Sequence, residues 1–259
     1  MSNKGALHWR SAARTHRGKI RRINEDSFLE RSDYGIWVVA DGMGGHAVGD
    51  VASQMVVGTL ADMPYQPDLE AFEAEVRRRL QEVNHRLREE AAVRNERVIG
   101  STVVVLLSYG QHCIYLWAGD SRIYVFRDGR LRQLSHDHSH VEALINHGLL
   151  DRREAQNHPS AGAITRAVGA VDTLELDRGT LEAKSGDIFL LCSDGLHNEV
   201  SDEDIKGILK EESCQKSSEM LVELALERGG RDNVTVVVVC AEDQIDGTIT
   251  LLNPLMSNP

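Results

Sequence analysis

The sequence predicts an α+β layered sandwich, and two observations lead to this expectation. Short apolar runs rich in β-branched residues follow one another along the chain, and several are separated only by turn residues. Segments with a helical spacing of apolar residues flank these runs instead of alternating with them. Consecutive strands with segregated helices favour layers of sheet and helix over an alternating βαβ fold.

The apolar runs predict strands that pair as hairpins. Their apolar and β-branched composition predicts strands over 36–40, 102–107, 113–118, 122–126, 187–192 and 233–240. Asp128-Gly129, a dipeptide typical of the type I′ turn, separates run 123–125 from run 131–134. Tyr109-Gly110 separates two further runs. We therefore expect mainly antiparallel pairing.

Helices are predicted in three places. The longest, of roughly 25 residues, is indicated by one apolar stripe with steps of three and four: Leu69, Phe72, Val76, Leu80, Val83 and Leu87. A shorter stripe predicts a helix around Met220, Leu221, Leu224 and Ala225. A third helix is expected over 50–60, with Asp50 as its cap.

Composition and charge narrow the function classes. The 259 residues carry 29 Lys and Arg against 40 Asp and Glu, a net charge of −11, which disfavours binding to nucleic acid. No apolar run reaches the roughly 18 residues of a membrane span, and no signal-peptide core is present, so we expect a cytoplasmic protein without membrane contact. The absence of repeats and linkers predicts one domain over 1–242, followed by a tail over 243–259.

No two of the four cysteines form a CxxC pair; they are Cys113, Cys192, Cys214 and Cys240. Cys113, Cys192 and Cys240 lie in predicted strands, and we expect them to be buried as small hydrophobes in a reducing compartment. No cysteine is followed six residues later by the Arg that a cysteine phosphatase requires. Cysteine chemistry is therefore not expected.

Acidic residues recur where predicted strands begin or end. Asp41, Asp120 and Asp194 each follow an apolar strand, Asp232 precedes the last strand, and Glu25-Asp26 opens the first. A single Asp in such a place is typical of a turn. Several carboxylates in one cleft repel one another unless divalent cations neutralise them, and all-oxygen ligands select Mg²⁺ or Mn²⁺ over zinc. The sequence thus predicts a binuclear Mg²⁺ or Mn²⁺ site.

A dinucleotide-binding loop is the alternative interpretation of the glycine-rich turn. Residues 42–47 satisfy the GxGxxA pattern after an apolar strand. However, Asp41 would point a carboxylate at the pyrophosphate, and no strand that ends in an acid follows about 20 residues later. We therefore disfavour this alternative.

Six motifs stand in a fixed order along the chain: 21–26 (RRINED), 40–46 (ADGMGGH), 100–102 (GST), 119–122 (GDSR), 193–195 (SDG) and 232–235 (DNVT). In order and spacing they resemble the motifs of bacterial metal-dependent protein phosphatases of the 2C type, the PPM family, over residues 10–241. The resemblance implies a four-layer α-β-β-α sandwich with two central, mainly antiparallel sheets flanked by helices. It also implies hydrolysis of phosphoserine and phosphothreonine in proteins.

The resemblance implies a set of metal ligands. Asp41 would bridge two cations, with the Gly42 carbonyl on the first and with Asp194 and Asp232 on the second. Asp120 and Asp194 would form a third, weaker cation position.

The remaining roles, also implied by the resemblance, concern waters, phosphate and support. Glu25 and Asp26 would hold metal-bound waters, Arg21 would bind the substrate phosphate, Asn233 would orient the region of the second cation, and Ser193, Gly195 and Thr102 would support the site.

The chemistry of phosphate monoesters suits these groups. Two cations about 3.5–4 Å apart generate a bridging hydroxide nucleophile and offset the charge of the phosphoryl group. A guanidinium binds phosphate with two contacts, and we assign this role to Arg21, three residues before Asn24, because adjacent side chains in an extended segment point oppositely and Arg22 then faces away. His46 is the candidate general acid; alternatively, it only caps the turn or the following helix.

Other segments are expected to be loops. The tract 136–140 (HDHSH) is predicted to be a solvated loop rather than a metal site. A flap over about 139–162, in which Val141, Leu144 and Ile145 share one helical face, should border the cleft and influence substrate choice. Small residues at 159–162 and Asn198 depart from the family pattern. In the tail, 248–252 is a candidate edge strand, and we expect disorder over 253–259.

Two functions of different classes follow. The first is a monomeric serine/threonine phosphatase that acts on the phosphorylated target of a Ser/Thr kinase in a signalling or secretion-control switch. The second is a noncatalytic phosphoprotein-binding regulator with the same fold. The complete set of Asp41, Asp194 and Asp232 favours the enzyme, because a binder does not need it. A metal nuclease is disfavoured by the net charge of −11.

Overall fold

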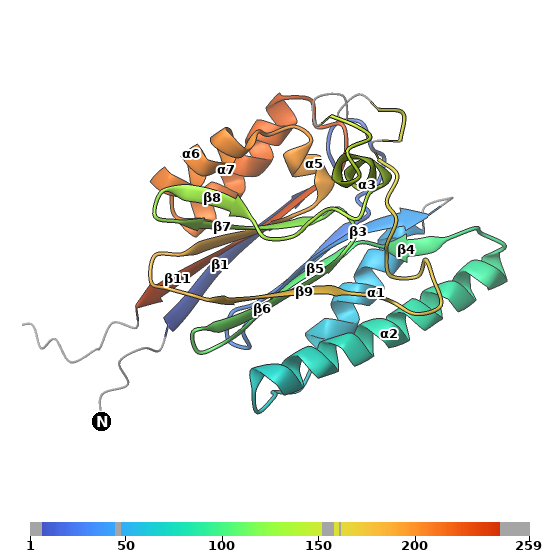
Figure 1. Cartoon of the computed structure of the whole chain (residues 1–259), viewed down its shortest axis with the longest axis horizontal. Coiled ribbons are helices and arrows are strands. Elements are labelled where there is room, and N and C mark those ends of the chain that lie inside the picture. The colour runs from blue at the N-terminus through green and yellow to red at the C-terminus, as the bar shows by residue number, and fades with distance from the viewer. Residues whose placement is uncertain (1–6, 45–47, 152–157, 161, 244–259) are drawn as a thin grey trace, which may run out of the picture.

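In the computed structural model, residues 7–44, 48–151, 158–160 and 162–243 are described. Their strands form two antiparallel sheets that face each other, and helices cover the outer face of each sheet (Figure 1). The expected four-layer α-β-β-α sandwich is therefore confirmed.

The first sheet has the strand order β1-β11-β10-β7-β8. Its strands are β1 (Leu7–His16), β7 (Arg122–Arg127), β8 (Arg130–Gln133), β10 (Ile188–Cys192) and β11 (Val234–Asp243). β7 and β8 form the expected hairpin, in which Asp128 has φ 50° and Gly129 has φ 72°, both positive as a type I′ turn requires.

The second sheet has the strand order β2-β3-β5-β6-β9, and β4 pairs with β3. These strands are β2 (Asp26–Arg31), β3 (Ile36–Gly44), β4 (Ile99–Ser101), β5 (Val103–Tyr109), β6 (His112–Ala118) and β9 (Asp177–Glu182). The predicted strands are confirmed, with small shifts at their ends. The expectation that Glu25-Asp26 opens the first strand was wrong, because β1 precedes Asp26, which begins β2.

The helices lie outside the sheets. Those described are α1 (Gly49–Ala61), α2 (Leu69–Arg94), α3 (His140–Asn146), α5 (Asp194–His197), α6 (Asp202–Glu211) and α7 (Cys214–Glu227). α1 and α2 cover the second sheet, whereas α6 and α7 cover the first (Figure 1). The long predicted helix is confirmed as α2, with 26 residues, and its cap Asp68 accepts a hydrogen bond from the Ala71 amide.

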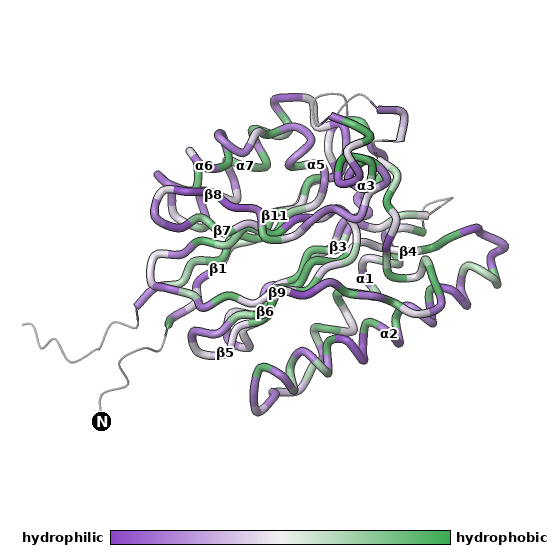
Figure 2. Tube along the Cα trace, in the orientation of Figure 1, coloured by the Kyte–Doolittle hydropathy of each residue, from purple (hydrophilic) through white to green (hydrophobic). Residues whose placement is uncertain are grey.

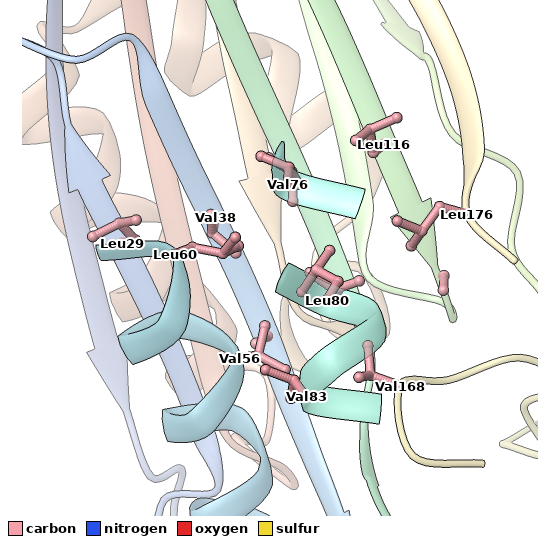
Figure 3. Packing of buried hydrophobic residues seen from close by; sticks show 14 of the residues in the cluster. Leu29, Val38, Val56, Leu60, Val76, Leu80, Val83, Leu116, Val168 and Leu176 are labelled. Carbon is pink, nitrogen blue, oxygen red and sulfur yellow. The ribbon is translucent and has the colours of Figure 1, made fainter. Parts of the chain in front are cut away.

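Apolar side chains fill the three spaces between these layers. Leu60 of α1, Leu80 of α2 and Val38 of β3 pack together beneath the helices of the second sheet (Figure 3). Trp37 and Phe189 are completely buried between the two sheets. A third cluster joins the first sheet to α6 and α7. The hydropathy pattern agrees, because the strands are mostly apolar whereas purple, hydrophilic stretches recur along α2 and α6 (Figure 2).

The start of α1 differs from the expectation. Asp50 does not cap this helix; it lies within the first turn, after Gly49. Instead, Glu25 Oε1 accepts a hydrogen bond from the Gly49 amide at 3.1 Å. A carboxylate at a helix N-terminus is stabilised by the unpaired amides and the helix dipole. The cap is therefore supplied by a residue distant in sequence.

Cys240 also differs from the expectation. Cys113 and Cys192 are buried and free, as predicted. Cys240 is partly exposed near the end of β11, where it forms a disulfide with Cys214 at the start of α7, with the Cα atoms 6.5 Å apart. The prediction for Cys240 was wrong because a spacing of 26 residues carries no signal of pairing. Among the described helices, none is long and apolar enough to cross a membrane.

Candidate metal centre

Five acidic residues expected at a metal site come from strand ends that the two sheets bring together. Asp26 and Asp41 are direct partners in the antiparallel pair β2–β3. Asp194 is the first residue of α5, Asp232 lies two residues before β11, and Asp120 lies in the turn between β6 and β7. The negative charges of the other four all act on Asp41, which is the common neighbour of the group. We refer to Asp26, Asp41, Asp120, Asp194 and Asp232 as the carboxylate cluster.

Burial and mutual repulsion disfavour the charged state of Asp26, Asp41, Asp120 and Asp194. Burial raises the pKa of Asp26 and of Asp120 to about 7 and that of Asp194 to about 6, and the neighbouring carboxylates add to each shift. Burial, with the charge of Asp26 next in importance, raises the pKa of Asp41 well above its ordinary value. Such a cluster is stabilised by bound cations.

The buried carboxyl of Asp26 is satisfied on one side only. Ser193 Oγ donates to Asp26 Oδ2 at 2.7 Å and accepts from the Thr235 amide at 3.0 Å, so Ser193 links Asp26 to β11. Within the described part of the chain, Asp26 Oδ1 is buried without a hydrogen-bond partner. An unpaired buried oxygen is costly, and a water or ion beside it would remove that cost.

Asp41 is positioned through its backbone. Its amide donates to Thr102 Oγ1 at 3.0 Å, and its carbonyl accepts from the Thr102 amide at 2.8 Å and from Ser101 Oγ at 3.0 Å. Thr102 Oγ1 also lies 2.7 Å from Ser121 Oγ, next to Asp120. Thr102 therefore ties Asp41 to the turn that carries Asp120.

Close backbone packing sets the positions of Gly42 and Gly195. The Gly42 amide donates to the Glu25 carbonyl at 3.1 Å, and a Cβ at Gly42 would overlap the Gly49 carbonyl. A Cβ at Gly195 would overlap the Asn233 carbonyl oxygen. Side chains at these two positions would force apart the segments that carry the acids.

Arg21 reaches the rim of the cluster. Its Nη2 donates to Asp232 Oδ2 at 2.5 Å, and this bond raises the pKa of the guanidinium. The Arg21 side chain remains 51% exposed, so it is accessible to a substrate. Arg22 is exposed, and its carbonyl accepts from Arg17 Nη1 at 3.4 Å.

Asn233 fixes the segment that carries Arg21. Its Oδ1 accepts from the Glu25 amide at 2.7 Å, and its Nδ2 donates to the carbonyls of Arg17 and Ile23, both at 2.9 Å. The sequence predicted an orienting role for this residue, but not that it would clamp residues 17–25. Burial raises the pKa of Glu25, which lies at the end of this segment.

The histidine tract is only partly a solvated loop. His136 and His140 are exposed, but the His138 ring stacks on Trp117 at 6.1 Å and accepts from the Gly119 amide at 3.2 Å. Asp137 forms a two-pronged ion pair with Arg122. The prediction of a solvated loop was therefore wrong for Asp137, His138 and the buried Ser139, because the base of the expected flap packs against β6 and β7.

Some expected site residues lie outside the described residues. These are His46 in the glycine-rich turn, positions 152–157 and 161 of the expected flap, and the tail from 244. Sequence reasoning also missed one residue that is described. His197 Nε2 lies 3.1 Å from the carbonyl oxygen of Asp120, and no motif or spacing indicates this contact.

The donor set suits hard divalent cations. The cluster offers carboxylate oxygens and the Gly42 carbonyl, the ligand types preferred by Mg²⁺ and Mn²⁺. Among the described residues, no three acidic, His or Cys side chains already enclose a single point. Mg²⁺ usually keeps several waters of its own, so a protein site for it needs to supply only part of its ligands.

Comparisons with known proteins agree with this site. Residues 14–227 match the protein phosphatase 2C family. The chain is 36% identical over 235 residues to the serine/threonine phosphatase Stp of Listeria welshimeri, covering 87% of this chain and 93% of that protein. It is 39% identical over 238 residues to the serine/threonine protein phosphatase PstP of Mycobacterium tuberculosis, covering 90% of this chain. The chain spans only 45% of the length of PstP.

Solved structures are also similar. PppA, described as a key regulatory component of the T6SS in Pseudomonas aeruginosa, is 42% identical with a TM-score of 0.86, covering 92% of this chain and 100% of that chain. The catalytic domain of PstP, solved in complex with two manganese ions, is 38% identical with a TM-score of 0.82 and the same coverage, 92% and 100%.

Proposed function

The chain belongs to the protein phosphatase 2C family of serine/threonine protein phosphatases, and we propose that it hydrolyses phosphoserine and phosphothreonine in proteins at a binuclear Mn²⁺ or Mg²⁺ centre. The observation that carries this proposal is the carboxylate cluster with Arg21 at its rim. When bound, the two cations supply a hydroxide nucleophile at neutral pH and a counter-charge for the phosphoryl oxygens.

Within the cluster, Asp41 is the proposed shared ligand, since it is affected by the charges of all the other members. The Gly42 carbonyl would complete the first position, and Asp194 and Asp232 would hold the second cation. Asp120 and Asp194 would hold a third cation more weakly.

Other residues hold waters, substrate and backbone. Glu25 and Asp26 would hold coordinated waters; the unpartnered Asp26 Oδ1 supports this role. The exposed guanidinium of Arg21 binds the phosphate with two parallel hydrogen bonds. Ser193, Thr102, Gly195 and Asn233 keep these groups in place through the contacts described above.

The leaving alkoxide of a phosphoserine requires a proton. His46, next to the glycine-rich turn that follows Asp41, is the proposed general acid on the basis of sequence alone, since it lies outside the part of the chain that the structure describes. The proposed catalytic domain covers residues 1–242 and acts as a monomer.

The substrate is proposed to be the target of a bacterial Ser/Thr kinase. Such kinases use ATP, so we propose that the reaction takes place in the cytoplasm. The similarity to PppA, a T6SS component, supports a role in a signalling or secretion-control switch. A noncatalytic regulator that only binds phosphoproteins is the alternative, and the presence of all five carboxylates argues against it.

Metal removal tests the proposal. We expect the chain to release phosphate from a phosphothreonine peptide and from p-nitrophenyl phosphate, to lose this activity in EDTA, and to regain it with Mn²⁺ or Mg²⁺ but not with Zn²⁺. Asp232→Asn should reduce turnover by orders of magnitude without unfolding the chain. The matched control is Asp33→Asn, because the Asp33 side chain is 71% exposed and lies in the turn at the opposite end of the β2–β3 pair from Asp26 and Asp41.

Two outcomes contradict the proposal. Full activity in chelator would exclude the metal-dependent reaction. Tight binding of the phosphopeptide without release of phosphate, in the presence of Mn²⁺, would favour the noncatalytic regulator. Circular dichroism melts of both variants show whether any loss comes from unfolding.

A further inference from the structure

His197 and Asp194 are presented by the same turn of helix. α5 consists of four residues, with Asp194 first and His197 last. Residues three positions apart lie on the same side of a helix, so the turn that points Asp194 at the cluster also points His197 toward it. The turn is closed by the Asn198 amide, which donates to the Asp194 carbonyl at 2.9 Å. Asp194 and His197 therefore move as one unit.

The imidazole of His197 connects this turn to Asp120. His197 Nε2 lies 3.1 Å from the Asp120 carbonyl oxygen. A carbonyl oxygen only accepts hydrogen bonds, so Nε2 carries the proton and donates it. The bond joins α5, which follows β10, to the turn between β6 and β7, and β7 pairs with β10 in the first sheet. It thus lies at the edge of the first sheet that faces the cluster, where the chain crosses over from β6 of the second sheet.

Both neighbours of Asp120 are fixed independently. The Gly119 carbonyl accepts from the His138 amide at 2.9 Å, and Gly119 has φ 111°, a conformation that favours glycine. Ser121 Oγ lies 2.7 Å from Thr102 Oγ1. The peptide group between Asp120 and Ser121 can still rotate, and the hydrogen bond from His197 to its carbonyl oxygen fixes its orientation. The direction of the Asp120 side chain follows from the orientation of that peptide.

We propose that His197 is a positioning residue that sets the placement of Asp120 relative to Asp194 and thereby the strength of the third, weaker cation position. This inference rests on the proposed function, since it assumes that Asp120 and Asp194 share a cation. It assigns His197 no contact with substrate. Asp194 also belongs to the second main position, but it is held by the Asn198 amide and by the packing of Gly195 against Asn233, neither of which uses the His197 ring. Loss of the ring's hydrogen bond should therefore release the Asp120 peptide and leave the two main cation positions unchanged.

The test compares variants that keep or remove the donor. His197→Gln keeps an N–H at nearly the position of Nε2, His197→Asn holds its N–H one carbon closer to the backbone, and His197→Met has no donor. Binding of Mn²⁺ to each chain is titrated without substrate, by calorimetry and by the electron paramagnetic resonance signal of free Mn²⁺. Melting temperatures in EDTA report on the fold alone.

We expect His197→Met to weaken the weakest Mn²⁺ binding step by about 10–100-fold, the usual effect of losing a group that orients a metal ligand, with the tighter steps unchanged. His197→Gln should stay within about threefold of wild type. If His197→Met does not fold, the comparison of Gln with Asn decides, because only Gln reaches the Asp120 carbonyl.

Three results overturn the inference: unchanged Mn²⁺ binding in His197→Met, equal weakening of all binding steps, or indistinguishable behaviour of the Gln and Asn variants. A lowered melting temperature in EDTA with unchanged Mn²⁺ binding would assign His197 a purely structural role. Failure of the proposed function is recognised separately, because then the wild-type chain itself would bind no Mn²⁺ or would keep its activity in chelator.

Discussion

Arg21 and Asp232, 211 positions apart in the chain, form an ion pair in which Arg21 Nη2 lies 2.5 Å from Asp232 Oδ2. Asn233, the next residue, holds the backbone on both sides of Arg21 through the carbonyls of Arg17 and Ile23. The guanidinium is therefore held beside the carboxylate cluster by the same short segment that supplies a proposed ligand.

Replacing Arg21 should weaken both substrate binding and turnover. Arg21→Ala removes a charged contact to phosphate, and we expect kcat/KM to fall by about 10- to 150-fold, corresponding to about 1.5–3 kcal/mol for a hydrogen bond to a charged group. Steady-state kinetics with a phosphothreonine peptide measure this loss. Arg21→Lys should recover only part of it, since an ammonium cannot make two parallel contacts.

Arg22→Ala is the matched control for charge and sequence position. Arg22 is exposed, and its contact given above uses the backbone carbonyl, which alanine retains. Its kinetics should be close to wild type. Equal losses in Arg21→Ala and Arg22→Ala would show that charge near the site, and not a specific guanidinium, is what matters.

Gly195→Ala should damage the site by steric overlap. An added Cβ would collide with the Asn233 carbonyl oxygen and would lie 3.3 Å from Val234 Cγ2. Asn233 follows Asp232 and directly precedes β11, which begins at Val234, so the added carbon must push Asp194 away from Asp232. We expect a loss of about 1–3 kcal/mol in the free energy of unfolding, typical of overpacking, together with a more than tenfold fall in kcat.

Gly207→Ala provides the comparison for this substitution. Gly207 is exposed in α6, and a Cβ there meets nothing within 4 Å. Alanine in the interior of an exposed helix should raise the free energy of unfolding by about 0.5–1 kcal/mol and leave kcat unchanged. Chemical denaturation gives the free energy of unfolding of both variants, and steady-state kinetics give kcat. A Gly195→Ala chain as stable and active as wild type would contradict the packing argument.

His138 should make the free energy of unfolding depend on pH. Burial lowers the pKa of this imidazole below its ordinary value of 6.5, and this effect outweighs Asp177 Oδ2, which lies 3.3 Å from His138 Nε2 and favours the charged form. Below pH 6.5 the unfolded chain binds a proton that the folded chain does not yet bind. The free energy of unfolding is therefore undiminished by His138 above pH 6.5, and it decreases as the pH falls toward the pKa of His138 in the folded chain.

Denaturation at several pH values tests this sign. Between pH 7.5 and pH 5, the free energy of unfolding of wild type should fall more steeply than that of His138→Gln. The site carboxylates are the same in both chains, so their contributions cancel in the difference. His85→Gln controls for the loss of an exposed imidazole, because the His85 side chain is 68% exposed on α2. A His138→Gln slope as steep as that of wild type would contradict the prediction.

The sequence predicted the elements whose pattern reflects one buried face. The apolar stripe from Leu69 to Leu87 forms the face of α2 that packs on the sheet, and its members Val76, Leu80 and Val83 are completely buried. β1 carries alternating polar residues such as Arg10 at the edge of its sheet, and its stability comes from pairing along its length with β11, which no local pattern reveals. β9 contains Gly179, which weakens a strand pattern but is required because a Cβ there would overlap the Tyr115 ring.

The same distinction applies to the site. The acids could be found because each stands where an apolar run begins or ends, and the sheets bring these positions together. The contacts made by Arg21, Asn233 and His197 could not be predicted in detail, because they join residues far apart in the chain that are brought together by the pairing of β1 with β11 and of β7 with β10. Such contacts follow from tertiary packing rather than from local sequence.

The role of His46 as general acid can be tested through the leaving group. A protonated imidazole accelerates departure only when the leaving oxygen requires a proton, as the alkoxide of phosphothreonine does. The phenolate of p-nitrophenyl phosphate leaves without one. We therefore expect His46→Ala to lower turnover of a phosphothreonine peptide by about 10²–10⁴-fold, the usual range for acid catalysis, and turnover of the aryl phosphate much less.

The comparison of the two substrates also controls for damage to the neighbouring site. His46 follows Asp41 by five positions, so the substitution could disturb the metal ligands, and that disturbance would slow both substrates to the same degree because both require the same nucleophile. A loss confined to the alkyl phosphoester thus separates proton donation from loss of metal. Equal losses on the two substrates would exclude the acid role and would assign His46 to the structure of the glycine-rich turn, the alternative that the sequence left open.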